Sequence, residues 1–86
     1  MATVLIFHEV DDVGHWLASP KRMELFGPLG MSARTFVDPT QSNRVGLIAE
    51  VPDMETFQNA MTSDAAAEAM KADGVRGDTV VVLVEG

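Results

Sequence analysis

The chain contains no cysteine, which excludes disulfide bonds and thiolate metal sites as means of stabilising it. A protein of 86 residues needs some such support, because folding alone it buries only about 60–65% of its unfolded surface. Association with a second subunit is a common alternative in small proteins. The composition therefore favours an oligomer.

Basic residues are also scarce, with six Lys and Arg against thirteen Asp and Glu and a net charge of −7. Affinity for nucleic acid depends largely on Lys and Arg, so we expect no nucleic-acid partner. No apolar run approaches the roughly 18 residues that a membrane helix needs. The first apolar run has no basic residues before it and is broken at His8, unlike a signal peptide. We therefore expect a cytoplasmic protein that binds no membrane.

The first third of the chain predicts a strand followed by an interrupted helix. The strand, Thr3–Val10, is apolar on both faces. Asp11 or Asp12 then caps a helix by accepting hydrogen bonds from its free amide groups. Ser19-Pro20 restarts this helix, and Gly27-Pro28 ends it.

The remainder predicts a hairpin, a second interrupted helix and a final strand. Strands Ser32–Asp38 and Arg44–Val51 flank a turn-rich segment and should pair antiparallel. The second helix is interrupted at Thr62–Asp64. After it, we expect a loop at Val75–Asp78 and a closing strand at Thr79–Glu85.

The two halves of the chain resemble each other. Phe7–Trp16 and Ile48–Phe57 share glutamate, valine and aspartate, then an apolar residue and an aromatic one; Gly30–Val37 likewise aligns with Gly74–Val81. Two such halves give the order β-α-β-β-α-β of the ferredoxin-like arrangement. We predict a single α+β domain over residues 1–86, with a four-stranded antiparallel sheet and both helices on one of its faces.

That arrangement leaves one face of the sheet uncovered. The uncovered face would expose Leu5, Phe7, Ile48 and part of the run Val80–Val84. A patch of this kind normally marks a contact surface. We therefore predict a homodimer, in which the open faces of two copies pair into a twofold α+β barrel and the sheet edges are removed.

The whole chain resembles the dimeric α+β barrel superfamily. The resemblance rests on the first strand, the split first helix, the central hairpin, the second helix broken near Met61–Ala65 and the closing VVVLVE strand. It implies a ferredoxin-like fold and a homodimer. The superfamily includes cofactor-free quinone-forming monooxygenases, polyketide cyclases, lactone isomerases and heme-degrading enzymes, so the fold does not select one activity.

The resemblance does not extend to the heme-degrading members, which use an asparagine, a tryptophan and a histidine. Here the first strand holds no asparagine, and Trp16 lies in the first helix. No phosphate loop, dinucleotide fingerprint or nucleophile elbow is present either. We expect no cofactor.

His8 is the main candidate for chemistry, because it interrupts the aliphatic face of the first strand. If that face meets the helices, His8 points into the gap that serves as the ligand cleft in proteins of this resemblance. A histidine there suits a general base toward a phenol or an activated methylene. The alternative is a core histidine bonded to a backbone carbonyl.

Two further sets of residues are weaker candidates. His15 is expected to face solvent, and a metal site of His8 and His15 with Glu9 or Glu50 is disfavoured because the glutamates fall on the opposite strand face. Methionines and aromatics at helical spacing form either core or the walls of an aromatic pocket. The proposed ligand-binding walls, beside His8, are Trp16, Phe26, Phe57 and Met61, with Met23, Met54 and Met70 near them.

Two functions remain open from the sequence. The first is a cofactor-free homodimeric enzyme of monooxygenase or cyclase type, acting on an aromatic or polyketide-like small molecule with His8 as catalytic base. The second is a non-enzymatic dimer that binds a small ligand or a partner. For Arg34, a solvated or interface position is favoured over binding of a carboxylate or phenolate. Structural roles are also favoured for Glu9 and Glu50, which are expected at the rim of the dimer face, where they could pair with Arg34 or Arg44.

Overall fold

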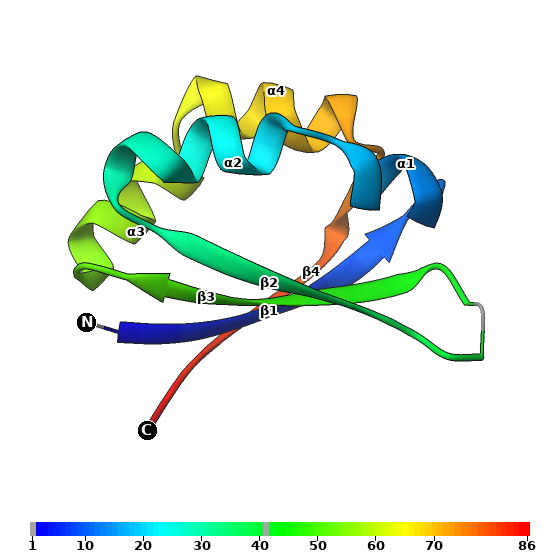
Figure 1. The fold of residues 1–86 in the computed structure, drawn as a ribbon, viewed down its shortest axis with the longest axis horizontal. Helices are drawn as coiled ribbons and strands as arrows, with labels where there is room; N and C mark the ends of the chain where they lie inside the picture. Colours follow the sequence, from blue (N-terminus) through cyan, green and yellow to red (C-terminus); the bar gives the residue numbers. More distant parts are fainter. Residues whose placement is uncertain (1, 41) are drawn as a thin grey trace.

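The computed structural model describes residues 2–40 and 42–86. In chain order the elements are β1 (Ala2–Val10), α1 (Val13–Ala18), α2 (Lys21–Phe26), the 3-10 turn η1 (Gly27–Leu29), β2 (Ser32–Val37), β3 (Arg44–Val51), α3 (Met54–Met61), α4 (Asp64–Ala72) and β4 (Val75–Val84). The strands form one antiparallel sheet in the order β2-β3-β1-β4. Figure 1 shows that the helices all lie on one face of this sheet.

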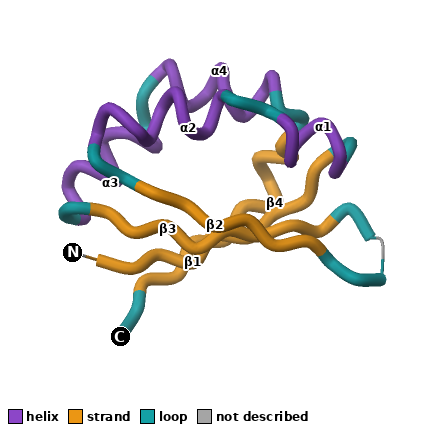
Figure 2. The backbone as a smooth tube through the Cα atoms, in the orientation of Figure 1, coloured by secondary structure: helices purple, strands orange, loops and turns teal. Residues whose placement is uncertain are grey.

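The predicted ferredoxin-like α+β fold is confirmed, with both of its helices split in two. Figure 2 shows α1 and α2 as one broken helical segment and α3 and α4 as the other. The capping residues explain where the segments begin. The side chains of Asp12, Asp53 and Ser63 each accept a hydrogen bond from a backbone N–H three residues later, at 3.0, 2.7 and 3.2 Å.

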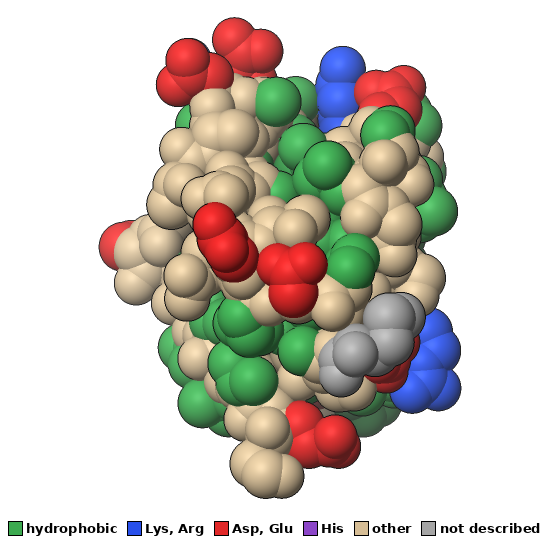
Figure 3. Space-filling view, turned by 90° about the vertical axis from the view of Figure 1, so that its left-hand side faces the viewer, with side chains coloured by type: hydrophobic (Ala, Val, Ile, Leu, Met, Phe, Trp, Pro, Cys, Tyr) green, Lys and Arg blue, Asp and Glu red, His purple; other side chains and the backbone are tan. Residues whose placement is uncertain are grey.

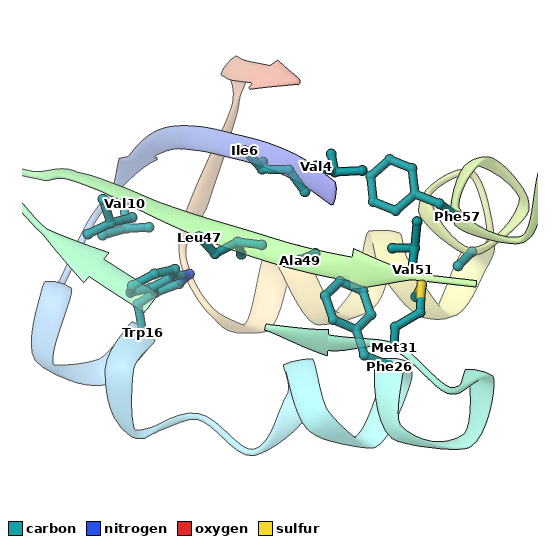
Figure 4. Packing of buried hydrophobic residues seen from close by; sticks show 12 residues of the cluster. Val4, Ile6, Val10, Trp16, Phe26, Met31, Leu47, Ala49, Val51 and Phe57 are labelled. Atoms are coloured by element: carbon teal, nitrogen blue, oxygen red, sulfur yellow. The ribbon is translucent and has the colours of Figure 1, made fainter. Parts of the chain in front are cut away.

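The core follows from the alternation of β1 and β3. Val4, Ile6, His8 and Val10 all point toward the helices and are buried, as are the inward residues of β3. Figure 4 shows two ends of this core: Trp16 lies near Val10 and Leu47, whereas the second end gathers Phe57, Val4, Val51, Phe26 and Met31.

The predicted loop at Val75–Asp78 is wrong, because β4 already begins at Val75. Val75 and Arg76 pair with Val10 and Glu9, and the register then shifts before Val81 pairs with Phe7. The turn-forming residues Gly77 and Asp78 therefore belong to a bulge inside a strand. The Thr79 hydroxyl satisfies the displaced backbone there: it accepts from Glu9 N–H at 2.8 Å and donates to the Arg76 carbonyl at 2.6 Å.

The face of the sheet away from the helices carries exposed apolar side chains. Leu5 pairs with Leu83, and Phe7 with Val81, and all four are exposed, Leu5 and Phe7 at 40% and 41%. Phe36 stands on the same face, across Gly46 from Phe7. We call Leu5, Phe7, Phe36, Val81 and Leu83 the open-face patch.

Figure 3, which looks at the end of the molecule that carries α3, shows hydrophobic side chains interspersed with mostly acidic charged ones.

Within residues 2–40 and 42–86, no helix has the length and apolar character needed to cross a membrane.

Gly74 offers a test of how the second helical segment is joined to β4. It has a φ of +72°, and an added Cβ would lie 3.4 Å from the Cβ of Asp11. A side chain in this left-handed conformation costs roughly 1–2 kcal/mol. We predict that Gly74→Ala lowers the free energy of unfolding by about this amount in urea titrations at fixed protein concentration.

Gly77→Ala is the matched control, because no atom of the described residues lies within 4 Å of a Cβ at Gly77. It should change the same free energy by less than about 0.5 kcal/mol. Equal effects of the two substitutions would contradict the assignment of Gly74 as a position that requires glycine.

Candidate functional site

A cavity lies between the sheet and the helices, with Trp16 at one side. About 60 Å³ of it is open to the centres of water molecules. Its lining is mostly apolar, and three polar side chains face it: His8, Arg22 and Asp73. The apolar lining consists of Ile6, Trp16, Leu25, Phe26, Leu47, Met61, Ala66, Ala69, Met70, Val75 and Val80.

His8 reaches the cavity from the inward face of β1. Its side chain is 7% exposed, and its ring stands edge-on to the Trp16 ring, with centroids 5.6 Å apart. Nδ1 is fully buried and has no hydrogen-bond partner among the described residues. Leaving a buried polar atom unpaired costs roughly 1–3 kcal/mol. Such an atom in a cavity wall is therefore a functional candidate.

Burial lowers the pKa of His8 below its ordinary value of 6.5, because the charged imidazolium loses its hydration. The positive charge of Arg22 acts in the same direction, and the neighbouring Glu9 backbone opposes both. The net effect keeps the ring neutral near neutral pH. A neutral histidine can accept a proton, which is the state that a general base requires.

Arg22 reaches the cavity from α2. Its guanidinium lies over the Trp16 ring, with Cζ 4.4 Å from the ring centroid, and it donates to the Trp16 carbonyl at 3.2 Å. Burial lowers the pKa of Arg22, and the charge of Asp73 partly offsets this. Arginine remains protonated under any such shift, so the cavity contains a cation.

Asp73 and Ser19 join the two helical segments beside the cavity. Asp73, at the end of α4, is buried and accepts a hydrogen bond from the Ser19 hydroxyl, which lies between α1 and α2. Nearby, a ring nitrogen of His15 lies 2.8 Å from the Ala72 carbonyl. These contacts hold the α1–α2 corner against the end of α4.

Not all of the predicted wall residues line this cavity. Trp16, Phe26 and Met61 do, as does Met70. Phe57 is buried but does not line it, because it packs at the far end of the core beside Val4 and Val51 (Figure 4).

Met23 is 53% exposed on α2, so the prediction that it lies near the cavity wall is wrong. Arg22 and Asp73 were not identified from the sequence. A charged residue within an otherwise apolar helical stripe was the only available signal.

The remaining polar candidates have structural partners. Glu9 pairs with Arg76 at 3.2 Å and not with the predicted Arg34 or Arg44. Glu50 accepts hydrogen bonds from the Thr3 hydroxyl at 2.9 and 3.1 Å.

His15 is exposed to solvent, as predicted, and its ring lies beside the Ala72 carbonyl at the end of α4. In the described ranges no three His, Asp or Glu side chains gather as a metal site would require.

Comparison with solved structures supports the fold. No family model matches the chain. No curated protein sequence matches it either. An antibiotic biosynthesis monooxygenase superposes with a TM-score of 0.67 at 15% identity, over 100% of this chain and 97% of that one.

Two other proteins superpose less closely. A protein from Arabidopsis thaliana gives 0.60 at 11% identity, covering 100% and 94% of the two chains. A candidate antibiotic biosynthesis monooxygenase from Deinococcus radiodurans gives 0.59 at 10%, covering 100% and 91%. At these identities the similarity establishes the ferredoxin-like fold and nothing finer.

The lowered pKa of His8 predicts a pH dependence of stability. Below 6.5 the unfolded chain binds a proton at this histidine that the folded protein resists, so stability falls as the pH decreases through that range. We predict that the free energy of unfolding declines between about pH 7.5 and about pH 5, and that His8→Gln removes part of this decline. Urea titrations at several pH values measure it.

His15→Gln is the control, since it removes the exposed histidine. It should leave the His8 part of the decline intact. A decline that is the same in His8→Gln as in the original protein would show that His8 titrates normally in the fold.

Proposed function

We propose that this chain is a small homodimeric enzyme of the monooxygenase or cyclase type. It acts without a cofactor on an aromatic or polyketide-like molecule, and His8 is its catalytic base. The observation that carries the proposal is the buried, unpartnered Nδ1 of a neutral histidine in the wall of an apolar cavity. The fold shared with an antibiotic biosynthesis monooxygenase is consistent with it.

The chemistry assigned to His8 is a single proton transfer. Nδ1 accepts the proton of a phenol or of a methylene next to a carbonyl, and the electron pair stays on the ligand as a phenolate or enolate. Trp16 and Phe26 supply flat apolar surfaces for a planar ligand, with Met61 beside them. This step is common to oxygenation and to cyclisation, so the geometry fits either class.

The size of the cavity requires its walls to move. An apolar cavity that admits benzene measures about 150 Å³, which is larger than the 60 Å³ found here. Met61, Met70 and Leu25 are only partly buried. Methionine has three rotatable side-chain bonds and adapts readily, so these residues are suited to make room for a ring.

The homodimer in this proposal rests on the open-face patch. The patch draws its residues from β1, β2 and β4 and includes two phenylalanines, yet the helices cover only the opposite face. Pairing two patches would bury apolar area that a chain of 86 residues can hardly leave in water. Arg34 stands on the same face, beside Ile48.

We predict that Phe7→Glu converts the dimer to a monomer. A glutamate in the middle of the patch would have to be desolvated on association. Sedimentation velocity over a range of protein concentrations should show dimers for the original protein and monomers for the variant. Met23→Glu, which introduces the same charge on the helical side, should remain dimeric. A stable monomer of the original protein at micromolar concentration would refute the dimer.

The base role is tested with 2-indanone, an aromatic ketone with an activated methylene. We predict that the protein accelerates exchange of the methylene protons for deuterium in D₂O, followed by proton NMR. General bases contribute about 10²–10⁴-fold, so His8→Gln should lose acceleration by about 10²-fold or more. Binding of 2-indanone, followed by ligand NMR, should survive the substitution.

His15→Gln serves as the matched histidine control and should exchange the protons at the original rate. If 2-indanone binds but no exchange is accelerated, the protein is a ligand-binding dimer and not this enzyme. If His8→Gln only lowers the melting temperature and leaves exchange unchanged, the base is another group.

A further inference from the structure

Arg22 is a cation that the proposed proton transfer does not use. In the described part of the chain it is the only lysine or arginine that lines the cavity. It makes no ion pair among these residues, although the protein carries a net charge of −7. Desolvating an arginine is costly, so its place in a mostly apolar lining needs a reason.

Arg22 and His8 both line the cavity and are linked through Trp16. Both side chains contact the same indole: His8 edge-on at 5.6 Å between centroids, and Arg22 over the ring at 4.4 Å from Cζ to the centroid. One bond to the Trp16 carbonyl uses one of the five guanidinium N–H groups. No other partner of these donors is found among the described residues. The cavity thus has an unpartnered basic nitrogen and unused N–H donors in one lining.

We propose that Arg22 is a binding residue that holds the ligand oxygen on which negative charge develops when His8 removes a proton. This inference rests on the proposed function and specifies its ligand: a small planar phenol, or a carbonyl compound that forms an enol, and not a plain hydrocarbon. The O–H or C–H proton moves to His8 Nδ1, the electron pair settles on the ligand oxygen, and Arg22 stabilises that oxyanion.

Asp73 also lines the cavity, and its carboxylate limits how strongly Arg22 can stabilise a negatively charged ligand. Its negative charge disfavours an anionic ligand, but it accepts a hydrogen bond from Ser19 and favours the charged form of Arg22. The formal charges of Arg22 and Asp73 sum to zero, so the resting cavity suits a neutral ligand. The guanidinium N–H groups can then donate hydrogen bonds to the ligand oxygen that becomes negative on proton transfer.

A purely structural role for Arg22 predicts something different. Its bond to the Trp16 carbonyl ties α2 to the last turn of α1, so removing it should lower stability in any case. A structural role alone would leave the protonation state of a bound phenol unchanged. The test therefore reads the ligand and not the melting temperature.

The probe is 4-nitrophenol, whose phenolate absorbs visible light and which titrates near neutral pH. We predict that the bound form has a pKa lower than the free form by about one unit or more, since a nearby opposite charge favours ionisation. Arg22→Gln should abolish this shift, and Arg22→Lys should keep part of it. Lys21→Gln, an equal charge change at the adjacent exposed residue, should keep all of it.

His8→Gln separates this inference from the proposed function. We expect the bound phenol to keep its lowered pKa in this variant while 2-indanone exchange is lost. If Arg22→Gln folds and keeps the shift, or if His8→Gln alone removes it, Arg22 is not the oxyanion partner and the base role of His8 stands. If 4-nitrophenol does not bind the original protein at all, both the ligand cavity and this inference are overturned.

Discussion

The structure depends on the central position of β1 in the sheet. With β3 on one side and β4 on the other, every inward side chain of this strand lies beneath the helices, and Val4, Ile6 and Val10 are almost fully buried. A histidine at an inward position of such a strand is almost fully buried, as His8 is here. Its hydration is lost, its pKa falls, and Nδ1 has no hydrogen-bond partner among the described residues. The site is thus a consequence of strand alternation and sheet order.

Much of this could be predicted from the sequence because it depends on local patterns. The alternation of β1, the capping residues Asp12 and Asp53, and the left-handed glycine at Gly74 each act within a few residues. The inward direction of His8 follows from the same alternation. The bulge in β4 could not be predicted from the sequence, because residues such as Gly77 and Asp78 are typical of loops as well as of bulges. Only the pairing of Arg76 with Glu9, across the sheet, decides between them.

The lining of the cavity was harder to predict for the same reason. Helical spacing places Phe57 and Phe26 on apolar faces but does not say at which end of the core each one lies. Phe57 precedes the break at Ser63, and its segment covers the end of the sheet opposite Trp16. Arg22 and Asp73 come together beside Trp16 only because α2 and the end of α4 meet there. The spacing within one helix can mark a charged residue on its apolar side, but it does not show that these two residues meet.

The two faces of β1 connect the proposed assembly with the proposed chemistry. Phe7 points into the open-face patch and His8, its neighbour, points into the cavity, so whatever packs on Phe7 also restrains the backbone that carries His8. Gly46 lies opposite Phe7. Because a Cβ at Gly46 would lie only 3.3 Å from the Ile6 carbonyl oxygen, β1 and β3 approach each other closely at this point. Catalytic groups must be held to within a fraction of an ångström. A second copy seated on the patch would supply that restraint from one side of the sheet. On the other side, the partly buried Met61 and Met70 could still rearrange so that a cavity of 60 Å³ admits a ring.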